Sequence, residues 1–384
     1  MASIRQSART IFKDNGNNSG ISMTSVDKLN INISDKDINT YAKKLGSAIS
    51  KILIFFKKNH LDKEPLLKEY YDYLCVAVQV LMDMSKAKDS ENVYWVNYNE
   101  DGSPFDLCFH EKSIQPYLDK LYKKRVILTS GTLSTARFDE KPYARTVKNL
   151  GLESNRRLEE GDPLETPYSF ENCLIYHDPD MIAPPKNGDR TKYITALAEK
   201  VIELIKATHG KALILFTSKR DMKAVYDLVK LADLDVDLLL QNENNTNECV
   251  ETFKENTNSC LFATGAFWEG IDVEGLALSN LIITKLPYPS DDPDIHAEKE
   301  TLSEAEYSEL LETEMILKLK QGFGRGKRSE NDEVLYSILD PRFSRKINVL
   351  KSVLPTTLKY TTSMEEAQQY GQEHIVSKEK TLVA

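Results

Sequence analysis

The chain has 384 residues, of which 41% are hydrophobic, and this length predicts two cores. Its net charge of −9 argues against a surface coated in basic charge, although a local basic groove remains compatible with it. The five cysteines form no CxxC pair or Cys/His cluster, so we expect neither a zinc site nor an iron–sulfur cluster. There is no apolar run as long as a membrane span and no signal-peptide pattern, so we expect a cytoplasmic protein without a membrane partner.

The first part of the chain divides into a lead-in and a helical hairpin. Residues 1–34 contain KDNGNNSG and little apolar periodicity, which predicts a flexible lead-in. Over residues 35–90, apolar side chains recur at three- and four-residue steps in two runs, the second from about Lys63 to Lys86. This spacing predicts two helices, and the hairpin carries no catalytic signature.

Residues 91–136 have the texture of short strands. VYWVNY and FDLCFH flank a turn at Asp101-Gly102, which predicts a β-hairpin, and a short helix follows from Ile114 to Tyr122. Val126 to Leu128 reads as a buried strand that ends in the hydroxyl-rich TSGTLS. Open α/β sheets bind their ligands at such carboxyl ends, but the same pattern is also typical of a plain turn.

Residues 137–355 alternate between apolar runs and amphipathic stretches, which predicts a doubly wound, parallel α/β domain followed by a C-terminal tail over residues 356–384. The predicted strands are Asn172–Tyr176, Ala212–Phe216, Val236–Leu240, Ser259–Thr264, Leu281–Thr284 and one within Val334–Arg342. The predicted helices are Thr191–His209, Arg220–Leu231, Asn247–Thr257 and Ser303–Lys320. We expect Gly210 to end the first of these helices as its C′ residue.

The motif QGFGRGKR follows the last predicted helix. If the helix continues into it, Arg325 and Arg328 lie one turn apart and can point the same way. Two guanidiniums directed at one point suit a polyphosphate, because each presents a planar fork of donors that keeps its charge. A solvated basic turn is the alternative for such a run.

Six segments together resemble a known family. TSGTLS, LILFTS, FATGAFWEGIDVEG, KLPYP, QGFGRGKR and VLYSILDPR occur in the order of motifs III to VI of superfamily 2 helicases, and they are most similar to the XPD/DinG branch. The resemblance implies an α/β fold: a RecA-like motor domain with a parallel sheet, preceded by a helical hairpin similar to the Arch insertion and by a few strands of a first motor domain.

The resemblance also implies roles for individual residues. Arg325 and Arg328 would reach the γ-phosphate of ATP, and Gln321 would orient that contact. Four further residues would line the nucleotide site: Glu269, Gly270, Asp272 and Gly324. For Glu269 and Asp272, the alternative is that they cap the following turn.

A second set of residues would act on single-stranded DNA or between motor domains. The residues that would contact the DNA are Thr217, Ser218, Thr264 and Trp268. Thr129, Ser130 and Thr132 would link the two motor domains, unless they form only a structural turn. Ser218 also suits an N-cap, and a tryptophan such as Trp268 is more often part of a core than a stacking platform.

Two motor elements are missing from the sequence. There is no GxxxxGK[ST] and no DExH ahead of TSGTLS, so the cradle for the phosphates of ATP and the Mg²⁺ carboxylate are absent. Together with the resemblance, this absence predicts the C-terminal motor portion of a DNA helicase, which shares ATP and Mg²⁺ with a separate Walker-containing polypeptide. The resemblance implies movement on single-stranded DNA in the 5′ to 3′ direction. The alternatives are a non-catalytic nucleic-acid-binding module and a truncated gene product.

Overall fold

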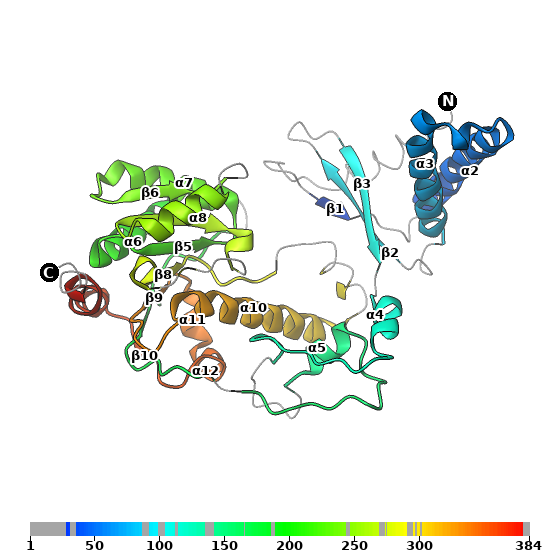
Figure 1. The fold of residues 1–384 in the computed structure, drawn as a ribbon. Coiled ribbons are helices and arrows are strands. Elements are labelled where there is room, and N and C mark those ends of the chain that lie inside the picture. The colour runs from blue at the N-terminus through cyan, green and yellow to red at the C-terminus, as the bar shows by residue number, and fades with distance from the viewer. Residues whose placement is uncertain are drawn as a thin grey trace. The chain divides into compact units, whose positions relative to one another are not determined.

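The computed structural model describes residues 28–30, 36–86, 92–98, 104–111, 114–134, 142–164, 166–185, 189–242, 246–268, 273, 275–289, 295, 298–299 and 302–378. The chain divides into two compact units (Figure 1). One contains residues 1–126, 149–151 and 289–308, and the other contains residues 127–148, 152–288 and 309–384. None of the described helices is both long and apolar enough to cross a lipid bilayer.

The first unit contains the predicted helical hairpin. It consists of α2 (Lys36–Lys58), a 3₁₀ turn (Leu61–Lys63) and α3 (Pro65–Met84), and Pro65 begins α3 because a first-turn residue needs no amide proton. The two helices bury a small core with the first strand that follows them: Ala42, Ile49, Val80, Leu81, Met84 and Tyr94.

A three-stranded antiparallel sheet accompanies the hairpin. Its order is β1 (Lys28–Asn30), β2 (Asn92–Tyr98) and β3 (Pro104–Glu111). Tyr94 ties the sheet to the hairpin, because its hydroxyl donates to a carboxylate oxygen of Asp83 at 2.6 Å. The expected lead-in over residues 1–34 is thus wrong for Lys28–Asn30, which pair with β2; residues 1–27 and 31–34 lie outside the described part of the chain.

The prediction of a buried strand at Val126–Leu128 is wrong. After α4 (Gln115–Leu121), the chain runs without regular structure through this segment, and Ile127 is 88% exposed. A strand needs a neighbour to accept and donate its backbone hydrogen bonds, and no described strand pairs with these residues.

The second unit is built on a seven-stranded parallel sheet, which confirms the predicted fold class. The strand order is β10-β4-β9-β8-β5-β7-β6. In chain order the strands are β4 (Leu174–His177), β5 (Ala212–Phe216), β6 (Asp237–Leu240), β7 (Ser259–Thr264), β8 (Asn280–Ile283), β9 (Leu335–Ile338) and β10 (Lys359–Thr361).

The segment at residues 356–384 is not a tail, as far as it is described. β10 adds a parallel strand beside β4, and α13 (Met364–Tyr370) follows it and continues into a π-helical turn over Gly371–Val376. A strand of three residues is too short to show an apolar period, and its partner lies far away in the sequence.

Helices cover both faces of the larger sheet (Figure 1). Side chains of α6 (Thr191–Thr208), α7 (Lys219–Val229) and α13 share one core. The opposite core contains side chains of α8 (Thr246–Glu255), α10 (Glu304–Gly326), α11 (Pro341–Arg345) and α12 (Ile347–Lys351). Successive residues of each central strand point into the two cores in turn, which is why these strands read as continuous apolar runs.

Candidate functional site

Helix α10 carries the arginine motif. The helix extends to Gly326, beyond the predicted end at Lys320, so Gln321 and Arg325 are helical and Arg325 lies in the last turn. Arg328 lies two residues past the helix end, in a loop. Both arginines are partly exposed, and Gly324 is exposed with no atom within 4 Å of the place where a Cβ would lie.

The loop after α10 is held by its own side chains. Asp332 accepts the amide protons of Arg328 and Ser329 with one carboxylate oxygen, at 2.8 Å each, and the hydroxyl of Ser329 donates to the other oxygen at 2.8 Å. These hydrogen bonds fix the backbone from which the Arg328 side chain extends.

Lys327 turns inward. Only 4% of the residue is exposed, and its Nζ donates to the carbonyl oxygens of Glu330 at 2.8 Å and Asp332 at 2.9 Å. The ammonium group therefore closes the loop and is not available to a phosphate.

Gly326 allows a close approach between α10 and β9. A Cβ at this position would lie 2.7 Å from the hydroxyl oxygen of Tyr336, whose ring stacks on Phe323 with centroids 4.5 Å apart. The Tyr336 hydroxyl donates to the carbonyl of Phe323 at 3.2 Å, and burial raises its pKa well above the usual value, so it stays a donor. The arginine motif is thereby fixed to the sheet.

Trp268 belongs to the core, which contradicts its prediction as a contact for DNA. The residue is 1% exposed, its Nε1 donates to the carbonyl of Phe216 at 3.1 Å, and a Cβ at Gly322 would lie 3.0 Å from its ring. The indole thus joins the end of β5 to α10, and a base cannot stack on it here. Glu269, Gly270 and Asp272, the next nucleotide candidates, lie outside the described residues.

The polar residues at the carboxyl ends of β5 and β7 lie near each other. Phe216 and Thr264 are register partners, so Thr217 and Thr264 lie at the carboxyl ends of adjacent parallel strands. Thr217 is exposed, whereas Thr264 is 7% exposed and its amide donates to the Gln241 side chain at 2.7 Å.

Ser218 has the alternative role foreseen for it. Its Oγ accepts the amide proton of Asp221 at 3.3 Å and so caps the N-terminus of α7. The hydroxyl group holds the helix start in place. The prediction that Thr217, Ser218 and Thr264 contact DNA stays a prediction.

The segment with Thr129, Ser130 and Thr132 is a surface turn. The hydroxyl groups of Ser130 and Thr132 are 3.2 Å apart, and the amide of Thr132 donates to Ser130 Oγ at 3.3 Å. Lys320 of α10 donates from Nζ to the carbonyl of Ser134 at 3.2 Å, so this turn is tied to the helix that carries the arginine motif. The predicted coupling role stays a prediction.

A charged cluster that the sequence pattern does not reveal lies at the carboxyl ends of the parallel strands. Arg190 and Asp221 form a two-point ion pair with distances of 2.6 and 3.1 Å, and Arg342 lies 2.6 Å from the buried carboxylate of Asp340. Lys285 lies nearby, and burial together with Arg342 lowers its pKa. KLPYP and LDPR carry part of this cluster in the sequence, but only the fold brings their charges together. The described residues contain no group of His, Cys, Asp or Glu side chains that could hold a metal ion.

Comparisons with known proteins agree with this geometry. Residues 201–360 match the family described as the helicase C-terminal domain. The 3'-5' exonuclease DinG of Bacillus subtilis is 25% identical over 86% of this chain and 37% of its own length. The probable ATP-dependent helicase YpvA of Bacillus subtilis is 26% identical over 81% of this chain and 46% of its own length. The ATP-dependent DNA helicase YoaA of Escherichia coli is 30% identical over 65% of this chain and 38% of its own length.

The chain thus spans less than half the length of these curated relatives. Among solved structures, one described as apo XPD aligns with 94% of this chain and 71% of its own, at a TM-score of 0.54 and 15% identity. That likeness shows a shared fold. The match to the helicase C-terminal domain at residues 201–360 and these relatives show that this chain is similar to a C-terminal portion of DinG-like helicases.

Proposed function

We propose that this chain acts as the C-terminal motor portion of an ATP-dependent DNA helicase. It supplies the arginine pair and part of the track for single-stranded DNA, while a first motor domain with the Walker elements supplies the rest of the ATP site. The observation that carries the proposal is the position of Arg325 in the last turn of α10 and of Arg328 on a loop fixed by Asp332.

The arrangement suits a nucleotide phosphate. Gln321, Arg325 and Arg328 would hold ATP from this side, and the open space at Gly324 lets a phosphate approach the backbone closely. Bound ATP with Mg²⁺ supplies the phosphoryl group that is transferred to water. The part of the arginines is to stabilise the charge that develops on that group, and an arginine acting across domains is worth roughly a thousandfold in rate.

The carboxyl edge of the sheet suits a nucleic-acid backbone. Thr217 is exposed there beside Thr264. At the same strand ends, Lys285 lies among the ion pairs Arg190–Asp221 and Arg342–Asp340, so the cluster carries one net positive charge. Hydroxyl and cationic groups bind phosphates without reading the sequence of bases, which a protein moving along a strand requires. By the family resemblance, we propose movement in the 5′ to 3′ direction.

The test measures ATP hydrolysis and DNA binding by the purified full chain. We expect little hydrolysis by the chain alone, with or without single-stranded DNA, and DNA-stimulated turnover after a Walker-containing polypeptide from the same cells is added. In that mixture Arg325→Ala should lower the rate by roughly a thousandfold. Arg156→Ala removes the same charge from an exposed position outside the site and serves as the control.

Two results would contradict the proposal. DNA-stimulated turnover by the chain alone, lost in Arg325→Ala, would show that the ATP site is complete without a partner. The second result is an absence of ATP turnover at a saturating concentration of the partner, together with binding of a labelled oligo-dT that depends on salt but not on ATP. It would identify a non-catalytic nucleic-acid-binding module.

A further inference from the structure

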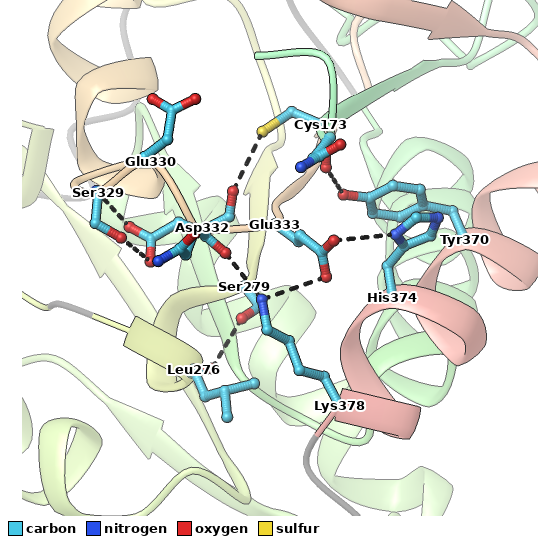
Figure 2. Close-up of polar contacts among 12 residues, drawn as sticks. Cys173, Leu276, Ser279, Ser329, Glu330, Asp332, Glu333, Tyr370, His374 and Lys378 are labelled. Carbon is cyan, nitrogen blue, oxygen red and sulfur yellow. Dashed lines mark hydrogen bonds and ion pairs between the residues drawn. The ribbon is translucent and has the colours of Figure 1, made fainter. Parts of the chain in front are cut away.

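The loop that carries Arg328 is also contacted on its outer side by a helix near the C-terminus. We call residues 327–333 the arginine loop and residues 364–378 the C-terminal helix, which comprises α13, its π-helical turn and a last turn. Figure 2 shows this contact: side chains of the C-terminal helix point at the arginine loop and at the start of β4.

Two side chains of the C-terminal helix hold the exit of the arginine loop. Lys378 donates from Nζ to the carbonyl of Asn331 at 2.8 Å and lies 3.5 Å from one carboxylate oxygen of Glu333 (Figure 2). His374 Nδ1 lies 3.4 Å from the other oxygen of Glu333. Since Glu333 immediately precedes the buried Val334, these contacts lie where the loop enters the sheet.

The start of β4 is attached to the same helix and the same loop. The Tyr370 hydroxyl donates to the carbonyl of Asn172, and the Tyr370 ring stacks on His374 with centroids 4.5 Å apart. Burial raises the pKa of the Cys173 thiol to about 11, so it stays protonated, and its Sγ lies 4.0 Å from the carbonyl of Asp332. The loop is therefore bordered by β4 on one side and the C-terminal helix on the other.

The C-terminal helix is itself firmly placed. Ala367, Ile375 and Val376 are buried, and Gly371 packs so closely on the end of α6 that a Cβ there would lie 2.5 Å from the carbonyl oxygen of Ala207. The side-chain amide of Gln372 donates to the same carbonyl at 3.0 Å. A helix anchored in this way can act as a rigid support for the loop.

From this geometry we infer that the C-terminal helix positions Arg328, with Lys378 and Glu333 as positioning residues. Lys327 fixes the entry of the arginine loop from inside, and the contacts of Lys378 with Asn331 and Glu333 fix its exit from outside, so the backbone of Arg328 is held at both ends. The inference rests on the proposed function, because it gives Arg328 a fixed direction toward a nucleotide.

Hydrogen–deuterium exchange on the full chain tests the structural half of this inference. We expect Lys378→Ala to speed amide exchange in residues 327–334 about threefold to tenfold, with unchanged exchange in β5 and an unchanged thermal midpoint. Lys378→Arg should restore the original exchange. Lys359→Ala removes a lysine that is exposed on β10 and is the matched control. Equal loop exchange in Lys378→Ala and the unaltered chain would overturn the inference, and so would faster exchange throughout the domain.

Turnover in the mixture with the Walker-containing polypeptide tests the functional half. Lys378→Ala should lower kcat several-fold while KM for ATP changes little, and Lys378→Arg should recover kcat. An unchanged kcat would overturn the positioning role. If the mixture that contains the unaltered chain gives no turnover, the proposed function fails, and the exchange experiment still decides whether the C-terminal helix orders the loop.

Discussion

Three glycines within five residues of α10 have different environments. Gly322 faces the Trp268 ring and Gly326 faces Tyr336, whereas Gly324 faces open space. A glycine inside a helix costs stability relative to alanine, because the unfolded chain loses more freedom on folding. At Gly322 and Gly326 the close packing leaves no room for a side chain, whereas Gly324 has room for one.

Alanine substitutions at two of these glycines should therefore have opposite effects on stability. Gly326→Ala should lower the free energy of unfolding by about 1–3 kcal/mol, since its Cβ would overlap the Tyr336 ring. Gly324→Ala should raise it by about 0.5–1 kcal/mol. Urea unfolding followed by circular dichroism measures both. Equal effects of the two substitutions would contradict the close approach of α10 to Tyr336.

His177 makes stability depend on pH. It lies at the end of β4, its Nδ1 is 2.7 Å from the Ser344 hydroxyl, and its ring is 5.4 Å from that of Phe343. Burial, and then the charge of Lys351, lowers its pKa below the usual value of about 6.5. The unfolded chain thus takes up a proton more readily than the folded chain.

It follows that the free energy of unfolding should fall as the pH drops below about 6.5 toward the lower pKa of the folded state. His177→Gln removes the titrating group, so the variant should lose this part of the pH dependence. Thermal midpoints between about pH 5 and 8 measure it. If the thermal midpoints of the variant and of the unaltered chain change in parallel across this pH range, His177 does not contribute to the pH dependence of stability.

At the scale of elements, Trp268 is the junction of β5, β7 and α10. It ends the 3₁₀ turn Gly265–Trp268 that follows β7, donates a hydrogen bond to the end of β5 and packs against Gly322. Three of the motifs that carry the family resemblance therefore share one buried side chain, which can transmit a shift of one element to the others.

Substitution of Trp268 should affect stability and leave DNA binding unchanged. Trp268→Phe should lower the free energy of unfolding by about 1 kcal/mol through the lost hydrogen bond, and Trp268→Ala by about 3–5 kcal/mol. Affinity of the folded fraction for a labelled oligo-dT, measured by fluorescence anisotropy, should stay the same. A loss of about 1–3 kcal/mol in binding energy would instead indicate a stacked base.

At the scale of the molecule, the chain holds two units with separate cores. Leu81 belongs to the core of the helical hairpin, and Leu213 is fully buried in β5 of the larger sheet. Each of these cores consists of side chains from its own unit, so a cavity made by one substitution lies within one unit.

Leucine-to-alanine substitutions should consequently act on one unit at a time. Leu81→Ala should destabilise the unit with the hairpin by about 2–5 kcal/mol, and Leu213→Ala should do the same to the unit with the parallel sheet. Differential scanning calorimetry should show two transitions, each shifted by one substitution only. A single transition that moves in both variants would show that the two units unfold together.

Local sequence patterns are enough to predict the central strands of the larger sheet. Ala212–Phe216 and Ser259–Thr264 are strands with the predicted bounds, because strands buried on both faces are continuous apolar runs. The left-handed Gly210 after α6 and the family motifs are also local signals. Arg325 lies beyond the predicted helix end at Lys320, so its position on α10 followed from the sequence only on the condition that the helix continued.

Which polar and aromatic side chains are buried depends on contacts between distant parts of the chain. Lys327 looks like part of a basic surface run, yet it is buried because two loop carbonyls accept its protons. β10 forms because it can pair with the edge strand β4. Val126–Leu128 has no regular structure because no described strand pairs with it. Such outcomes depend on partners far away in the sequence, and the contact of Lys378 with the arginine loop is of the same kind.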